Sequence, residues 1–396
     1  MNTMDLLSAA YHPTANEFYS HLLKQPGLSY DKQHQLWIAA RAQDIEEILA
    51  SPDCTVRPIG EAVPLALQGT SAGEVFSLLI RMNEGDAHHC GKMVMQQCLR
   101  VFEPIQLHQT SKQLASKLAS ELNFEEANAL NHFAQRLPLY TVASLLSFEP
   151  KTLPLITDAI SQFVLCLSPL SGTTEIESAS RAAQTLLTEF HMLVQTQTVK
   201  PNSLIAQIQT RAKELGWNNA NAILCNLIGL LSQTYEASSG LISNALTCLI
   251  QYPDQREQLS QQPKLIPAFV TEACRLHSPV QNTRRFVISD TVVAGIHLRA
   301  GERILLLLAA ANIDPAIHVQ PLEFDIARAN HRLYSFGSGR HACPGTAIAL
   351  AISHSAIEVL LAQHIAWGQL NWRYRRSLNG RLPEFLPRKM NDCRHF

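Results

Sequence analysis

The sequence predicts a mainly α-helical protein with a small β region. Apolar residues recur at three- and four-residue spacing over residues 102–122 and 179–197, with polar residues between them, which is typical of surface-packed helices. A third segment, 221–252, is apolar on nearly every face and ends before Pro253, so we expect a long helix through the middle of the molecule. Segments with the pattern of strands are few and short.

The predicted β region lies within residues 284–308, where RRFVIS, TVVAGIHL and ILLLL are separated by turn residues. Downstream, TAIALAISHSAIEVLLAQHI (346–365) predicts another long helix. Upstream, the segment 55–82 opens with proline and glycine, which indicates a flexible lid loop. No repeat, low-complexity tract or Gly/Ser-rich linker divides the sequence, so we expect one domain over residues 1–396.

The composition argues against several classes of protein. The chain is 46% hydrophobic with a net charge of −1, so it can bury a large core but offers no basic surface for nucleic acid. Its first residues lack the pattern of a secretory signal peptide, and its longest uniformly apolar run, 304–311, is too short to span a bilayer. We therefore expect a cytoplasmic protein that binds neither nucleic acid nor membrane.

One of the nine cysteines stands in an unusual segment, FGSGRHACPG (336–345). The cysteines are odd in number and scattered, with no CxxC pair, which argues against a disulfide framework and against zinc or iron–sulfur sites. In this segment, however, Gly337, Gly339 and Gly345 allow left-handed or tight turns and close approach to a flat ligand. Cys343 precedes a predicted helix, whose N-terminus favours the thiolate form that binds a redox-active iron. An inert buried thiol is the alternative.

The segment resembles the haem-binding loop of the cytochromes P450, F-G-x-G-x-H-x-C-x-G, at every fixed position. These positions are Phe336, Gly337, Gly339, His341, Cys343 and Gly345. Other family patterns occur in the expected order. EACR supplies Glu272 and Arg275, FDIAR supplies Arg328, and AAANIDP (309–315) is similar to the family's A-A-N-R-D-P. The resemblance covers about residues 80 to 365.

This resemblance implies a P450-like fold, which is a triangular helical prism around a buried haem b (iron protoporphyrin IX). Cys343 would ligate the iron, and Phe336 would shield the sulfur. Arg285, His341, His88 and Lys92 occupy positions that bind the haem propionates in the family, with Lys92 in place of an arginine. His88 and Lys92 are four residues apart on one helix face, and a merely solvated face is the alternative for them.

The segment QTYEAS (233–238) departs from the family's oxygen-activation pattern. Glu236 takes the position of the acid, but Ala237 replaces the threonine that helps deliver protons, and Gln233 and Thr234 replace two small residues. Thr234, Ser238 or a substrate hydroxyl could organise a relay water. The two hydroxyls could instead bond back to helix carbonyls.

The implied activity is that of a haem-thiolate monooxygenase, an oxidoreductase that oxidises or hydroxylates a small organic molecule. It would use O2 and electrons from a ferredoxin-type partner with an NAD(P)H-dependent reductase, and Arg340 is a candidate contact for that partner. Residues 55–82, 163–175 and 280–287 should shape a pocket for a neutral or amphipathic substrate. Because of Ala237, two alternatives stay open: peroxygenase, coupling or dehydration chemistry, or a haem-binding protein without oxygenase activity. A helical protein without haem is a third, separate alternative.

Overall fold

The structure is a computed structural model that describes residues 4–195, 203–330 and 332–386. The α-helices are α1 (Ala15–Leu23), α2 (Ala42–Ala50), α3 (Ser71–Leu78), α4 (Gly85–Arg100), α5 (Pro104–Ser120), α6 (Ala127–Leu145), α7 (Leu153–Phe163), α8 (Thr173–Gln195), α9 (Leu204–Glu214), α10 (Ala220–Gln251), α11 (Pro253–Gln261), α12 (Ile266–Leu276), α13 (Leu308–Ala311) and α14 (Thr346–Leu361). The strands are β1 (Ser29–Asp31), β2 (Leu36–Ala39), β3 (Cys54–Thr55), β4 (Thr283–Val287), β5 (Thr291–Val293), β6 (Ile296–Leu298), β7 (Arg303–Leu306), β8 (Asn371–Tyr374) and β9 (Pro383–Leu386). Short 3-10 helices are η1 (Ala9–Tyr11), η2 (Leu65–Leu67), η3 (Ile80–Met82), η4 (Pro150–Thr152), η5 (Val164–Leu167), η6 (Pro263–Leu265), η7 (Gly339–His341) and η8 (Trp367–Gln369).

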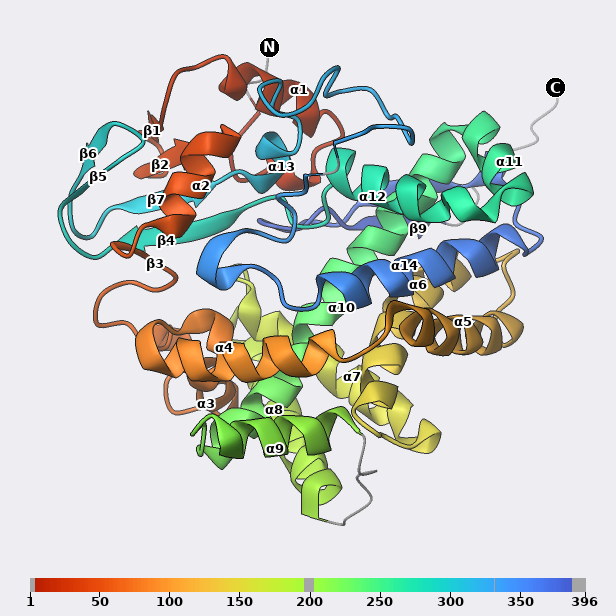
Figure 1. Ribbon diagram of the computed structural model, residues 1–396, viewed down its shortest axis with the longest axis horizontal. Helices are drawn as coiled ribbons and strands as arrows, with labels where there is room; N and C mark the ends of the chain where they lie inside the picture. The colour runs from red at the N-terminus through yellow and green to blue at the C-terminus, as the bar shows by residue number, and fades with distance from the viewer. Residues whose placement is uncertain (1–3, 196–202, 331, 387–396) are drawn as a thin grey trace.

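Helix α10 is the axis of the helical part of the molecule (Figure 1). It packs against α3, α6, α7, α8, α12 and α14. Two runs, 225–229 and 238–249, are completely buried, as expected for a helix that is apolar on all sides. The helix ends at Gln251, two residues before Pro253, which cannot donate a backbone hydrogen bond to continue it.

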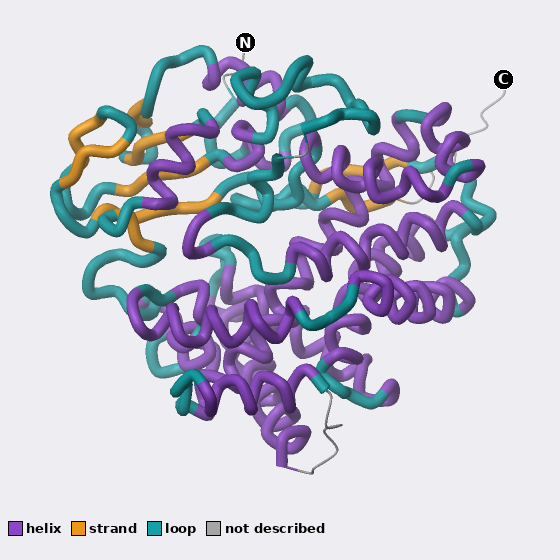
Figure 2. The backbone as a smooth tube through the Cα atoms, in the orientation of Figure 1, coloured by secondary structure: helices purple, strands orange, loops and turns teal. Residues whose placement is uncertain are grey.

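The strands lie mainly on one side of the molecule, and helices fill the other side (Figure 2). The main sheet has the order β1-β2-β7-β4-β3; only the β2–β7 pair is parallel. Residues of α2, β4 and β7 form a second apolar cluster that includes Ile45, Ile48, Val287 and Ile304. Two separate hairpins, β5–β6 and β8–β9, complete the β region. The sheet thus holds β4, which carries Arg285, in register with β7.

The predicted fold class is confirmed, since the structure is mostly helical with small sheets. The helices expected at 102–122, 221–252 and 346–365 are α5, α10 and α14, although α14 stops at Leu361. The helix expected at 179–197 is α8, and its last two predicted residues lie outside the described residues. The opening of the segment 55–82, where we expect a loop, contains no helix or strand over 56–64, and the rest of the segment contains η2, α3 and η3. No helix in the described ranges is long and apolar enough to cross a membrane.

Candidate functional site

Cys343 lies in the loop between η7 and α14. The loop is closed by a hydrogen bond of 2.8 Å that the Cys343 N–H donates to the Phe336 carbonyl. Gly337 and Gly339 have φ values of 66° and 65°, a conformation that other residues rarely adopt. Gly345 has φ −93° and ψ 11° and lies in a turn, so of the two expected conformations it adopts the tight turn and not the left-handed one. A Cβ on Gly345 would lie 3.8 Å from the Cys343 Sγ, in ordinary van der Waals contact, so this glycine borders the thiol.

The Cys343 thiol is accessible although protein surrounds it closely, as in a recess. Burial raises the pKa of this thiol, while the Gly345 N–H, the Lys92 ammonium and the Thr346 hydroxyl favour the thiolate. The expectation that the helix end favours the thiolate agrees with the direction in which the Gly345 N–H and the Thr346 hydroxyl act, but burial outweighs them and the net pKa is raised. A bound metal cation would reverse the balance, since it deprotonates a coordinating thiol.

Buried basic side chains of α4 lie beside the cysteine loop. His88 and Lys92 are both buried, so the alternative of a solvated helix face is wrong. The His88 ring is 4.3 Å from the His341 ring, centroid to centroid, and the Lys92 ammonium donates to the carbonyl of Ala342. Burial, followed by the charges of His341 and Lys92, lowers the pKa of His88 to about 4. The predicted residues of α4 and of the cysteine loop are therefore brought together.

Arg285 approaches the same loop from β4. It is buried, and burial lowers the pKa of its guanidinium to about 10, although Glu84 acts in the opposite direction. Its Nη1 donates to the Arg284 carbonyl at 2.8 Å, but its Nε is buried without a hydrogen-bond partner among the described residues. The His88 Nε2 is orphaned in the same way. Arg285 Nε is thus a buried donor without an acceptor, and His88 Nε2 is a second one in the tautomer that carries its proton there.

Glu84, at the N-terminus of α4, is a member of this site that the sequence analysis missed. Its carboxylate lies 3.0 Å from both His341 Nε2 and Arg340 Nε, and these contacts help hold its pKa at about 2 against the effect of burial. Arg340 also donates to the carbonyls of Ser51 and Cys54, at 2.9 Å each. The expectation that Arg340 serves as a partner contact is not supported, because its donors are used within the chain.

The ion pair expected from EACR is present in α12. The Arg275 guanidinium donates to both carboxylate oxygens of Glu272, at 2.7 and 2.8 Å, and the two side chains are 1% and 0% exposed. Arg328 joins them at 3.1 Å from Glu272 Oε1. Arg275 also donates to the carbonyls of Asn312, Pro321 and Glu323, so the triad ties α12 to the segment that leads into the cysteine loop.

The comparisons with known proteins agree with this geometry. The sequence profile of the family Cytochrome P450 matches residues 174–364. The putative cytochrome P450 133B2 of Xylella fastidiosa (strain 9a5c) is 30% identical over 284 residues, which are 69% of this chain and 71% of the relative. The chain belongs to the cytochrome P450 family.

Other P450s are similar over comparable lengths. The biotin biosynthesis cytochrome P450 of Bacillus subtilis (strain 168) is 28% identical over 66% of this chain and 67% of its own length. Among solved structures, CalO2 has a TM-score of 0.83 at 20% identity and covers 98% of this chain and 99% of its own. P450BioI was solved in complex with a hexadec-9Z-enoic acid-ligated acyl carrier protein. It has a TM-score of 0.81 at 23% identity, and the match covers 94% of this chain and 98% of P450BioI. These two structures establish the P450 fold.

The chain is thus a P450-type monooxygenase, an oxidoreductase whose family cofactor is haem. The residues beside Cys343 suit that cofactor. Four groups that carry or can carry positive charge (His88, Arg285, Arg340 and His341) act on one carboxylate, Glu84, and a fifth, Lys92, acts on His88 and Cys343. The two orphaned donors, His88 Nε2 and Arg285 Nε, are of the kind that a buried carboxylate requires. A P450 haem carries two such propionates.

The P450 oxygen-activation segment lies at the middle of α10. Gln233 is exposed and residues 234–237 are partly exposed, whereas the runs on either side are buried. The Thr234 hydroxyl donates to the Leu230 carbonyl at 2.7 Å, and Ser238 is buried. Of the two interpretations of Thr234, back-bonding to the helix is therefore the one observed. Gln233 Nε2 donates to the Gly229 carbonyl at 2.9 Å.

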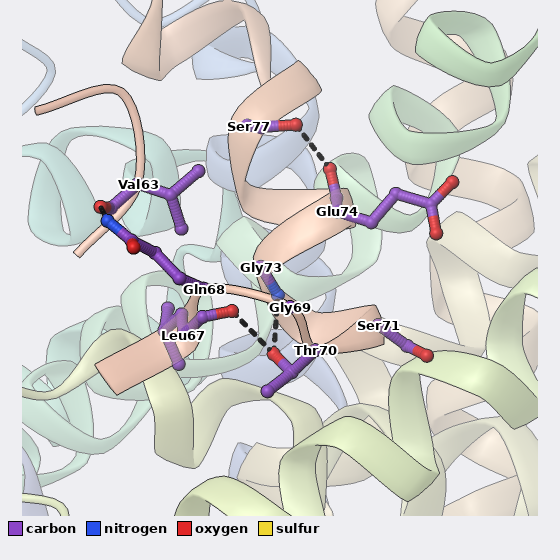
Figure 3. Close-up of a pocket in the computed structure, with 9 residues that line it drawn as sticks. All are labelled: Val63, Leu67, Gln68, Gly69, Thr70, Ser71, Gly73, Glu74 and Ser77. Atoms are coloured by element: carbon purple, nitrogen blue, oxygen red, sulfur yellow. Dashed lines mark hydrogen bonds between the residues drawn. The ribbon is translucent and has the colours of Figure 1, made fainter. Parts of the chain in front are cut away.

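The predicted lid segment of this P450 borders a cavity of about 480 Å³ (Figure 3). Its lining residues are Val63, Leu67, Gln68, Gly69, Thr70, Ser71, Gly73, Glu74 and Ser77. Thr70 caps α3, since its hydroxyl accepts from the Gly73 N–H at 3.0 Å and donates to the Leu67 carbonyl at 2.8 Å. A Cβ on Gly73 would collide with the Leu67 carbonyl, so this close turn requires glycine. The cavity wall is thus fixed by hydrogen bonds within 65–77.

Proposed function

We propose that this P450 binds haem b through the Cys343 thiolate and oxidises or hydroxylates a small organic molecule. It would use O2 and electrons from a ferredoxin-type partner that draws on an NAD(P)H-dependent reductase. The observation that carries the proposal is the accessible Cys343 thiol beside a buried basic cluster with two orphaned donors. The proposal includes a cytoplasmic location and a single domain over residues 1–396.

In this proposal each buried donor has a role. His88 Nε2 and Arg285 Nε donate to the propionates, which supply the missing acceptors. His341 contacts Glu84 through Nε2, which leaves its Nδ1 available to the propionates. Lys92 neutralises charge near the thiolate and holds the loop through the Ala342 carbonyl. Phe336 shields the sulfur side, while Gly337 and Gly345 keep bulk away from the loop.

Haem, when bound, supplies the redox-active iron at which O2 is reduced. The chain must deliver protons to that side of the site, and we assign this task to the middle of α10. Ala237 has no hydroxyl, and the Thr234 hydroxyl is used by Leu230. The groups left are Glu236, Ser238 next to Ala237, and a hydroxyl of the substrate. Gln233 is also available, because its amide gives one N–H to the Gly229 carbonyl and keeps a second N–H and its oxygen.

Ala237 also favours a second candidate function. A P450 with a weakened proton relay suits reactions that need fewer delivered protons, such as peroxide-driven oxidation, coupling or dehydration. If the chain delivers no protons at all, it is a haem protein without oxygenase activity. Turnover with hydrogen peroxide in the absence of any reductase would favour the peroxygenase. Reversible ligand binding without turnover of any kind would favour the inactive haem protein.

The haem assignment is tested by expressing the chain with a haem precursor and recording the spectrum of the reduced, CO-treated protein. We expect the strongly red-shifted Soret band of thiolate ligation, and we expect Cys343→Ser to abolish it. Cys90→Ser is the matched control, because Cys90 is a partly accessible thiol of α4; its band should equal that of the unaltered chain. Absence of the band in the unaltered protein, or its persistence in Cys343→Ser, would overturn the proposal.

A further inference from the structure

Arg81 is a cation without a partner at the boundary of α3 and α4. It lies in η3, and no described residue forms a hydrogen bond or an ion pair with its guanidinium; its Nε is completely buried. Protein atoms surround this guanidinium closely, yet the residue is partly exposed, so it borders space that a ligand can enter. A guanidinium nitrogen that has no contact with water requires an acceptor. The buried arginines Arg275, Arg328 and Arg381, in contrast, use their donors on carboxylates or carbonyls.

The backbone on either side of Arg81 is held in place. The Ile80 N–H donates to Asn226 Oδ1 and Asn226 Nδ2 donates to the Leu78 carbonyl, both at 2.8 Å, so η3 is anchored to α10. On the side of η3 that faces α4, a Cβ on Gly91 would come within 2.8 Å of the Ile80 side chain, so α4 packs closely against η3. The Arg81 side chain therefore leaves a rigid segment, and its position does not depend on a mobile loop.

No acid among the described residues forms an ion pair with Arg81. Burial lowers the pKa of Arg81, and the Cys166 thiol in η5 acts in the opposite direction. Burial raises the pKa of that thiol to about 12, so Cys166 is neutral and cannot serve as a counterion. Arg81 thus links η3 with η5, which belong to two of the three segments, 55–82 and 163–175, that the sequence predicts to shape the substrate pocket.

Arg81 is separate from the basic cluster beside Cys343. The groups that act on His88, Arg285 and Cys343 do not include Arg81, and none of the cluster acts on Arg81. The cluster has enough donors for two propionates without it. The neighbours of Arg81 in sequence, Leu79 and Ile80, are buried and apolar.

We propose that Arg81 binds the carboxylate of an apolar organic acid and thereby orients this acid as the substrate of the P450. A guanidinium presents parallel donors that match a carboxylate, and a single cation without a second one nearby fits a single negative charge better than a phosphate dianion. The apolar walls of η3 and η5 would hold the hydrocarbon part. The inference rests on the proposed function, and it narrows an amphipathic substrate to a carboxylic acid.

The test compares acids with alcohols of the same skeleton. Benzoate, octanoate and hexadecanoate, each with its primary alcohol, are titrated at pH 7.5 into the haem-loaded protein. Binding is followed by calorimetry and by the change in the Soret band. At least one acid should bind ten times or more as tightly as its alcohol. In Arg81→Gln that preference should fall to less than threefold while the affinity for the alcohol stays unchanged, and Arg81→Lys should retain part of it.

Arg181→Gln is the matched control, because Arg181 is an exposed arginine of the nearby helix α8; its preference should equal that of the unaltered protein. The proposal is overturned if no acid binds better than its alcohol, or if the preference survives in Arg81→Gln. Failure of the proposed function is distinguished by the reduced CO spectrum. A protein with the thiolate Soret band and no acid preference refutes only the role of Arg81.

Discussion

Glu236 and Arg375 form an ion pair, with 2.6 Å between Glu236 Oε1 and Arg375 Nη2. The pair joins the middle of α10 to the residue that follows β8, and the two side chains are 46% and 44% exposed. A pair this exposed stabilises a fold by only about 0–1 kcal/mol. The ion pair therefore acts mainly by orienting the Glu236 side chain, whose carboxylate points toward the C-terminal hairpin.

Glu236→Gln should lower the rate of substrate oxidation about a hundredfold, because it removes the acid of the proposed proton relay. The free energy of unfolding should change by less than about 1 kcal/mol, since the lost ion pair is exposed. Steady-state oxidation of a bound substrate and urea unfolding measure the two effects.

The control is Glu384→Gln, which removes the similarly exposed Arg373–Glu384 pair of the same hairpin, where 2.8 Å separates Arg373 Nε from Glu384 Oε2. This variant should match the unaltered protein in rate. If Glu236→Gln and Glu384→Gln oxidise substrate equally fast, Glu236 is only a surface residue and the relay must start elsewhere.

Gln233→Ala should disturb the oxygen-binding side of the site more than Thr234→Val. Gln233 is exposed and lies one helical turn before Ala237, and its amide keeps a second N–H and its oxygen after donating to the Gly229 carbonyl. The Thr234 hydroxyl, in contrast, gives its one proton to the Leu230 carbonyl. We expect Gln233→Ala to shift the C–O stretching frequency of the reduced CO complex and to release at least twice as much peroxide per electron. Thr234→Val should change neither quantity.

Ala237→Thr provides the complementary change, because it restores the hydroxyl of the family pattern. It should reduce peroxide release if the relay of the native protein is weak. An unchanged stretching frequency in Gln233→Ala, together with a shift in Thr234→Val, would contradict the assignment.

The sequence predicts the parts of this site that depend on local spacing. The residues of 336–345 act together because they are adjacent, and the Glu272–Arg275 pair follows from two residues one turn apart on α12. His88 and Lys92 share a face of α4 for the same reason. Such features need no knowledge of how distant segments meet.

Features that depend on distant pairing could not be predicted in this way. Glu84 contacts His341 only because folding brings the N-terminus of α4 to a loop that is 257 residues further along the chain. Strand β2 was missed because it is four residues long and pairs with β7, so that Trp37 lies opposite Ile304. The direction of the Cys343 pKa depends on how closely the fold surrounds the thiol, and no local motif reports that burial.

Glu272→Gln should destabilise the protein by about 3–5 kcal/mol, because it leaves two buried guanidinium groups without their carboxylate. Arg275 and Arg328 are both buried, and neither can regain water without disrupting the segment after α12. Urea unfolding followed by circular dichroism measures the change in free energy.

The control for this variant is Glu214→Gln, which removes an exposed pair with Arg211, where 2.7 Å separates Arg211 Nη1 from Glu214 Oε2. Its effect should stay below about 1 kcal/mol. Equal effects of the two variants would mean that burial of the triad adds nothing to stability.

His318→Leu should flatten the loss of stability in mild acid. His318 is 1% exposed, and burial together with the charges of Arg275 and Arg328 lowers the pKa of its imidazole to about 4, while Glu272 acts in the opposite direction. Because the unfolded chain takes up a proton near pH 6.5 and the folded chain only near pH 4, stability contributed by the neutral ring is present above pH 6.5 and is lost as the pH falls to 4. A shift of this size lowers the free energy of unfolding by about 3 kcal/mol between pH 6.5 and pH 4.

Urea midpoints measured from pH 7 to 4 should therefore fall less steeply in His318→Leu than in the unaltered protein. The control is His364→Leu, which replaces an exposed histidine and should fall as steeply as the unaltered protein. Parallel slopes for all three proteins would show that His318 titrates alike in the folded and unfolded chains.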